Sequence, residues 1–211
     1  VCIVYRRELS QMVRQLFRAL MAPSELHDLK FAKVALLVVV GTIPTGLIGV
    51  GLGGLFEEAA LDVAVVGAAL VVNGVILLGL GRVQTRHDAS GTSGRLLTEL
   101  TMVDALIIGT AQGFAVFRGI SRSGSTITTG LVRGLSREAA AAYSFLLSIP
   151  AILGALVLTL SKHDVIIGDA WSTYLVGGLA ACVSGTIALL LLLRLLNRGR
   201  LQHFAWYCFA V

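Results

Sequence analysis

The sequence predicts an all-α integral membrane protein, a polytopic helical bundle that includes one re-entrant helical hairpin. Of its 211 residues, 56% are hydrophobic and 14% are charged, whereas soluble domains carry roughly 25% charged residues. A helix needs about 20 mainly apolar residues to cross a bilayer. Four runs approach or exceed this length, and they cover residues 34–55, 63–81, 137–160 and 173–193. We expect one membrane domain over residues 1–211.

The first part of the chain, residues 5–33, is polar and basic. Apolar residues such as Leu9, Met12 and Phe17 recur in it at helical spacing, which predicts an amphipathic helix on the membrane surface. Both ends of the chain stop inside apolar stretches too short to cross a bilayer. We therefore expect a fragment truncated at both ends, or alternatively two short interfacial tails.

The run 34–55 is rich in glycine, which permits close helix packing, and Pro44 favours a kink in it. The same glycines would suit the interface of a homodimer. In the run 63–81, Asn73 is the only strongly polar side chain, and a hydrogen bond to a neighbouring helix is its expected role. The three cysteines are far apart in apolar segments and are expected to be packing residues; they are Cys2, Cys182 and Cys208.

Residues 103–134 predict the re-entrant hairpin. Residues 103–117 are apolar but are interrupted by Asp104 and Gln112, and apolar segments this short are often re-entrant. A polar turn follows, and residues 127–134 return as a second short helix. Irregular backbone is tolerated at membrane depth where it lines a cavity. Asp104 stands near a helix start, where a carboxylate stabilises the helix dipole.

The basic residues concentrate in alternate loops. Although the formal net charge is +5, the arginines lie in short loops between apolar runs, which indicates topology and not a nucleic-acid-binding face. By the positive-inside rule, loops 5–33, 82–102 and 194–203 face the cytoplasm, while 57–62 and 161–172 face outward. A hairpin that enters from the cytoplasmic side satisfies this count and places its turn near mid-membrane.

The turn Phe117–Thr126 holds two arginines, two glycines and four hydroxyl side chains. Such a polar cluster is costly in a membrane and is by default a functional site. A helix starting at Ser121 or Ser123 would point free N–H groups at an anion, and Arg122 would add a bidentate fork for phosphate. Arginines that merely snorkel to the interface would leave four hydroxyl groups unexplained. Gln112 either lines this site or pairs with a neighbouring helix.

Residues Gly119–Thr126 resemble the PGxSRSxxT motif of the undecaprenyl-diphosphate phosphatase family, the bacitracin-resistance type. Residues 134–154 are similar to the helix that follows this motif, and Gly41–Pro44 and Ala111–Gly113 fit upstream. The resemblance implies a multi-pass enzyme of the bacterial inner membrane that hydrolyses undecaprenyl diphosphate to undecaprenyl phosphate. This reaction recycles the lipid carrier of cell-wall synthesis and gives bacitracin resistance. The resemblance also implies two inverted repeats, each with a re-entrant hairpin, of which this chain matches the second.

The resemblance further implies roles for individual residues. Ser121, Arg122 and Thr126 match the family's functional serine, arginine and threonine and are expected to be catalytic. The expected substrate-binding residues are Gly119, Ser123, Gly124, Ser125 and Gln112. Arg122 would clamp the non-bridging phosphate oxygens. Ser121 is expected to bind more than to attack, because the chain shows no His or acid placed to activate it.

Two departures from the family pattern affect these expectations. Arg118 replaces the family's proline, which we expect to be a tolerated change. The family's first motif, an acidic pair followed by a serine- and histidine-containing stretch, is absent from the sequence. The family depends on a divalent cation, Mg²⁺ or Ca²⁺, and we expect its ligands to lie outside this chain. If the sequence is complete, we expect no catalysis.

The expected partners are a polyprenyl diphosphate lipid and membrane lipid, without nucleic acid. Two alternatives to the phosphatase stay open. The first is a transporter or flippase that binds a phosphorylated lipid or an anion at a broken helix without hydrolysis. The second is a degenerate homologue with only a binding or resistance role.

Overall fold

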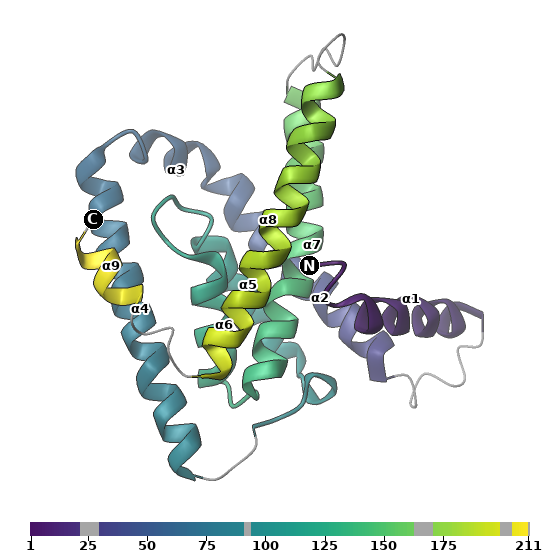
Figure 1. Ribbon diagram of the computed structural model, residues 1–211. Helices are drawn as coiled ribbons and strands as arrows, with labels where there is room; N and C mark the ends of the chain where they lie inside the picture. The colour runs from purple at the N-terminus through teal and green to yellow at the C-terminus, as the bar shows by residue number, and fades with distance from the viewer. Residues whose placement is uncertain (22–29, 91–93, 163–170, 199–203, 211) are drawn as a thin grey trace.

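The structure is a computed structural model that describes residues 1–21, 30–90, 94–162, 171–198 and 204–210 (Figure 1). Most of these residues are helical. The helices are α1 (Arg6–Met21), α2 (Lys30–Gly51), α3 (Gly53–Ala59), α4 (Val63–Ser90), the short 3₁₀ helix η2 (Leu97–Glu99), α5 (Met102–Phe114), α6 (Arg122–Val132), α7 (Arg137–Lys162), α8 (Trp171–Asn197) and α9 (Phe204–Ala210). Within the described residues the only β contact is an isolated bridge between Arg95 and Leu135. The predicted all-α class is confirmed.

Four of the described helices are long and apolar enough to cross a membrane. Their candidate spans are Lys30–Gly51, Val63–Thr85, Arg137–Ser161 and Trp171–Asn197. Helix α5 is apolar but shorter than these four. The chain is therefore a multi-pass helical membrane protein, as its composition predicts. The depth at which the α5–α6 hairpin lies in the membrane stays a prediction.

Helix α4 continues to Ser90, well into the segment 82–102 that the sequence predicts to be a loop. Its extension contains neither glycine nor proline between residues 82 and 90, so nothing in the local sequence breaks the helix. The extension is also anchored, because the buried Gln84 side chain donates a hydrogen bond to the Leu196 carbonyl of α8 at 3.5 Å. Part of the predicted loop is thus a helical continuation of the span.

The run predicted over residues 34–55 forms two helices. Helix α2 passes through Pro44 and ends at Gly51, and α3 begins at Gly53. Glycine loses more backbone entropy in a helix than any other residue. The cluster of glycines at this point is therefore the natural place for the helix to break.

Helices α2 and α5 cross in close backbone contact. A side chain on Gly109 would overlap the carbonyl oxygen of Gly41. The Thr45 hydroxyl donates to the Gly109 carbonyl at 2.8 Å, and the Tyr143 hydroxyl of α7 donates to the Leu37 carbonyl at 2.7 Å. Glycine in this part of α2 therefore serves packing within the chain, and the homodimer stays a prediction.

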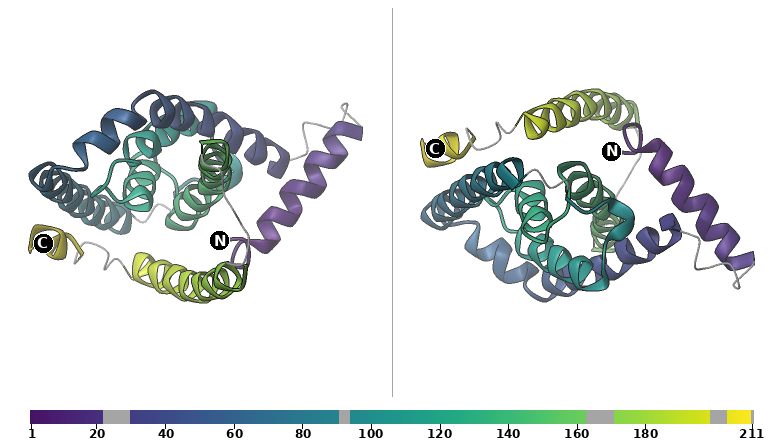
Figure 2. Two further views of the ribbon diagram at one scale, coloured as in Figure 1. Left: turned by 90° about the horizontal axis from the view of Figure 1, so that it is seen from above. Right: turned by 90° about the horizontal axis from the view of Figure 1, so that it is seen from below.

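Helices α5 and α6 form an antiparallel hairpin at the centre of the molecule (Figure 1). The first turn of α5 and the end of α6 are joined by an ion pair, in which Arg133 Nε lies 2.8 Å from Asp104 Oδ1. Helix α6 packs against both α4 and α7. Views from above and below show α4, α7 and α2 around this hairpin (Figure 2). The turn that connects α5 to α6 therefore lies at the other end of the hairpin from this ion pair.

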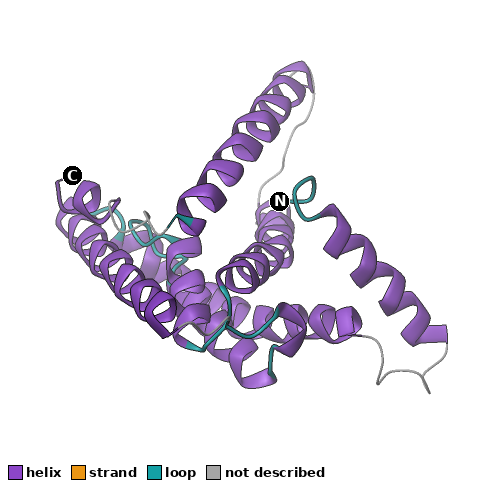
Figure 3. Cartoon of the chain, turned by 60° about the horizontal axis from the view of Figure 1, so that its bottom comes forward, coloured by secondary structure: helices purple, strands orange, loops and turns teal. Residues whose placement is uncertain are grey.

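The remaining helices lie outside this centre. Helix α8 contributes only two buried residues, Leu189 and Leu196. The upper parts of α7 and α8 extend away from the rest of the chain (Figure 1), which is drawn almost entirely as helix in Figure 3. The short helix α9 packs on α4, where the Phe209 ring leaves no room for a side chain on Gly74. The exposed faces of α7 and α8 are apolar, as expected of surfaces that contact lipid.

Candidate anion-binding site

The turn that joins α5 to α6 requires a glycine. Gly119 has φ +98°, a conformation that side-chain-bearing residues rarely adopt. A Cβ there would also lie 2.9 Å from the Cβ of Ala69 and 3.0 Å from the carbonyl oxygen of Val66, both on α4. Gly119, a glycine of the predicted motif, therefore allows the turn to pack directly against α4.

The start of α6 is fixed by two hydrogen bonds. Ser121 is the N-cap, and its hydroxyl oxygen accepts the Gly124 N–H at 3.1 Å. The Ser121 N–H itself donates to Asn73 Oδ1 of α4 at 2.9 Å. The Asn73 amide nitrogen donates to the Cys208 thiol sulfur of α9 at 3.2 Å. The expected role of Asn73 as a hydrogen bond between helices is confirmed, and Cys208 is a buried packing residue.

The two arginines of the turn face a large cavity. This cavity has a volume of about 840 Å³ and lies between the turn, α2 and α7. Arg118 and Arg122 are exposed, and neither guanidinium group has a hydrogen-bond or ion-pair partner among the described residues. Arg122 is also the first residue of α6, where the helix dipole favours a negative charge. Both cations are available to an anionic ligand.

Hydroxyl groups of the turn face a second, smaller cavity of about 200 Å³. Ser121, Ser123 and Gly124 line it together with Asn73 and Cys208. The motif thus divides between two cavities, with its guanidinium groups on one side and two serines on the other. The Ser121 hydroxyl accepts the Gly124 N–H, so its own hydrogen stays available to donate.

Other residues of the predicted site are buried. The Thr126 side chain is fully buried, and its hydroxyl bonds the Arg122 carbonyl at 2.9 Å and the Ser144 hydroxyl of α7. Ser125 is also buried, and its hydroxyl has no partner within the described part of the chain. In this structure Thr126 therefore acts on the site by holding α6 against α7.

Gln112 is fully buried between three helices. Its amide nitrogen lies 3.4 Å from the Thr45 hydroxyl of α2 and 3.5 Å from the Leu147 carbonyl of α7. Of the two roles that the sequence leaves open, this geometry favours pairing with neighbouring helices. Thr45, which the sequence does not single out, lines the large cavity directly.

A buried carboxylate holds the opposite end of the hairpin. Asp104 Oδ2 lies 2.9 Å from Arg95 Nη1 and also accepts from the Thr101 N–H and hydroxyl, while Oδ1 pairs with Arg133. Asp104 thus caps the helix start as predicted. Burial alone would raise the pKa of Asp104, but the hydrogen bonds from Arg95, Thr101 and Arg133 outweigh it and hold this pKa well below its usual range. The two arginine contacts join distant segments, so sequence spacing gives no signal for them.

The side chains around the turn do not fit a divalent cation. Within the described residues, no group of three or more His, Cys, Asp or Glu side chains is placed to hold a metal ion. The described lining of the large cavity offers hydroxyl, backbone and guanidinium groups and no carboxylate. Mg²⁺ and Ca²⁺ prefer several oxygen ligands, commonly carboxylates, whereas guanidinium groups bind anions.

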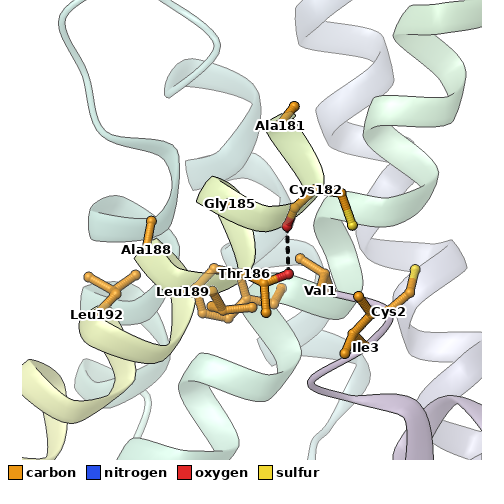
Figure 4. A pocket seen from close by; sticks show the side chains of 11 residues that line it. Val1, Cys2, Ile3, Ala181, Cys182, Gly185, Thr186, Ala188, Leu189 and Leu192 are labelled. Atoms are coloured by element: carbon orange, nitrogen blue, oxygen red, sulfur yellow. Dashed lines mark hydrogen bonds between the residues drawn. The ribbon is translucent and has the colours of Figure 1, made fainter. Parts of the chain in front are cut away.

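A third cavity, which the turn does not border, lacks, in its described lining, the arginine charge of the large cavity. It has a volume of about 660 Å³ and lies between the N-terminal residues, α7 and α8 (Figure 4). Apolar side chains and the two cysteines Cys2 and Cys182 line most of it. The Thr186 hydroxyl donates to the carbonyl of Cys182 at 2.7 Å, within its own helix. Its described lining contains no arginine or lysine, so it offers an anion no charged partner.

The fold and the turn together define a class: a multi-pass helical membrane protein with an arginine-bearing helix start inside a cavity. A family model described as "Bacitracin resistance protein BacA" matches residues 1–211. The chain belongs to this family.

Curated relatives support the same assignment. The undecaprenyl-diphosphatase of Desulfatibacillum aliphaticivorans is 42% identical over 180 residues, which are 85% of this chain and 63% of the relative. That of Desulforapulum autotrophicum is 39% identical over 219 residues, 100% of this chain and 76% of the relative. That of Methanothermobacter thermautotrophicus is 42% identical over 176 residues, 83% and 94% of the two chains. The chain therefore spans less than two thirds of the length of the first of these relatives and more of the other two.

Proposed function

We propose that the protein hydrolyses undecaprenyl diphosphate to undecaprenyl phosphate and phosphate in the bacterial inner membrane. The reaction would recycle the lipid carrier of cell-wall synthesis and give bacitracin resistance. The observation that carries the proposal is the pair Arg118 and Arg122, which lacks carboxylate partners among the described residues and borders a cavity of about 840 Å³ between two spanning helices. Membership of the family and the names of the relatives support the reaction.

In this proposal Arg122 contacts the terminal phosphoryl group. Its guanidinium fork and the start of α6 stabilise the charge that develops on the non-bridging oxygens. A water molecule attacks the terminal phosphorus, the bond to the bridging oxygen breaks, and the lipid phosphate leaves with that oxygen. The proton that the water loses passes to solvent, because the described lining of the cavity contains no carboxylate or histidine. Arg118 adds a second positive charge at the same wall of the cavity.

Ser121 and Thr126 support Arg122 from their observed positions. Ser121 caps α6 through the Gly124 N–H and so fixes the helix start that carries Arg122, while Ser121 itself lines the smaller cavity. Thr126 fixes the same helix to α7 through Ser144. Gly119 borders the large cavity directly, whereas Ser123, Gly124 and Ser125 belong to the same turn and support its shape from the other side, and Gln112 supports it from α5. The divalent cation stays a prediction, and its ligands are not found among the described residues.

The test is phosphate release from undecaprenyl diphosphate by the full-length protein in detergent. Arg122→Ala should lower the rate by at least about 100-fold, as the loss of a transition-state donor does. Arg82→Ala removes an exposed arginine of α4 and serves as the matched control, with a rate close to that of the wild type. Equal rates for the two variants would overturn the proposal. Uptake of the lipid into vesicles without phosphate release would indicate a transporter instead.

A further inference from the structure

Helices α2 and α7 turn small residues toward each other across the large cavity. The face of α2 consists of Thr42, Thr45, Gly46, Gly49 and Val50, and that of α7 includes Pro150, Ala151, Gly154, Ala155 and Leu158. These spacings of three and four residues place each set on one side of its helix. Neither face carries a charged side chain. Their glycine and alanine residues leave space between the two helices.

The glycines on these faces are not filled by neighbouring side chains. A Cβ on Gly46, Gly49 or Gly154 would have no heavy atom within 4 Å. On the same helix α2, Gly41 lies against Tyr143, Leu147 and the Ala105 carbonyl. The side of α2 at Gly41 is therefore closely packed, whereas the positions of Gly46 and Gly49 border open space.

Charge is present at only one part of this cavity. Arg118 and Arg122 project from the turn, and the walls contributed by α2 and α7 carry no charged side chain. A complementary ligand has an anionic group joined to an apolar chain. Free phosphate would match the arginines but would leave the apolar walls uncovered.

We propose that the first isoprene units of the substrate tail lie between α2 and α7, and that Gly49 and Gly154 determine whether a long chain can enter. This inference rests on the proposed function, because it takes the anionic group to be the diphosphate. A cavity of about 840 Å³ is of the size that holds a small-molecule ligand. The rest of a long tail would extend into the surrounding lipid.

The experiment substitutes Gly49→Leu and Gly154→Leu separately in the full-length protein. Leucine forms helices better than glycine, so both helices should persist, and a melting curve in detergent checks this. Gly177→Leu on exposed α8, where a Cβ also meets nothing within 4 Å, is the matched control. Phosphate release and calorimetric binding are measured with undecaprenyl diphosphate and with isopentenyl diphosphate, which has a single five-carbon unit.

Each cavity variant should lower the ratio of kcat/KM for the long substrate to that for the short one by about 10-fold or more. The control should leave this ratio unchanged. An unchanged ratio in both cavity variants, or an equal loss for the two substrates, would overturn the tail proposal. If the wild type binds both compounds but releases phosphate from neither, the proposed function fails. In that case the affinities for the long and the short diphosphate replace kcat/KM, and their ratio in each variant decides the tail proposal.

Discussion

Two arginines lie at each end of the α5–α6 hairpin, but among the described residues only those at the base have a carboxylate partner. At the base, Arg95 and Arg133 converge on the fully buried Asp104. At the tip, Arg118 and Arg122 border a cavity and have no carboxylate partner within the described residues. A charge is costly inside a membrane unless it is paired or lies at an aqueous or ligand-filled cavity. The comparison shows that arginine serves structure at the base and is free to bind an anion at the tip.

The largest effect on the base is expected from Asp104→Asn. This change leaves Arg95 and Arg133 without their shared counter-ion. Breaking a fully buried pair costs about 3–5 kcal/mol. The two arginine side chains are 35% and 38% exposed, and solvent screening should reduce the loss to about 1–3 kcal/mol. Unfolding in detergent measures it. A melting curve identical to that of the wild type would show that the ion pairs do not stabilise the hairpin.

A smaller effect is expected from acid, and its sign follows from the pKa of Asp104. Because this pKa is held below its usual range in the folded protein, the stabilisation is present above the unfolded value of about 4. It is lost as the pH falls through the lower, folded value. The contribution of Asp104 to the melting temperature should therefore be constant from about pH 8 to 5 and should decline below about pH 4. The decline should be steeper in the wild type than in Asp104→Asn, and equal slopes would contradict the assignment.

The smallest effect is expected at the tip, from Asn73→Ala. The Ser121 N–H would lose its acceptor on α4, and the Arg122-bearing helix start would be held less firmly. The net value of one hydrogen bond, about 0.5–1.5 kcal/mol, corresponds to a loss of roughly 2- to 13-fold in kcat. Cys208→Ala keeps the acceptor for Ser121 and should cost less. If Asn73→Ala and Cys208→Ala lowered kcat equally, the effect would come from the packing of α9 and not from the hydrogen bond to Ser121.

Much of this organisation can be predicted from the sequence, for physical reasons that differ between elements. The apolar runs predict helices because they are long enough to span as helices and a helix satisfies its own backbone groups within lipid. The hydroxyl-rich turn stands out because polar residues are rare in such segments. Gly119 is predictable as a motif residue, and the structure supplies its reason, a positive φ beside α4.

The sequence does not predict which residues of the turn face which cavity. Ser123 and Thr126 are both small hydroxyl residues of the same motif, yet Thr126 is fully buried against Ser144 while Ser123 lines the smaller cavity. The partners of Asp104 and Asn73 are likewise set by helix packing between distant segments. The sequence does not predict the continuation of α4 to Ser90, because the polar composition of residues 82–90 favours a loop although none of these residues breaks a helix.

The contrast between tip and base is tested most directly by ligand affinity measured together with stability. A methylene-bridged analogue of the lipid diphosphate, which cannot be hydrolysed at the bridge, is titrated into full-length wild type, Arg122→Ala and Arg133→Ala. Arg122→Ala should weaken binding by about 10-fold or more and leave the melting temperature unchanged, since a charge-assisted hydrogen bond contributes about 1.5–3 kcal/mol. Arg133→Ala should lower the melting temperature and leave the affinity of the folded protein unchanged. Wild-type affinity in Arg122→Ala, or an equal loss of affinity in Arg133→Ala, would contradict the division of roles.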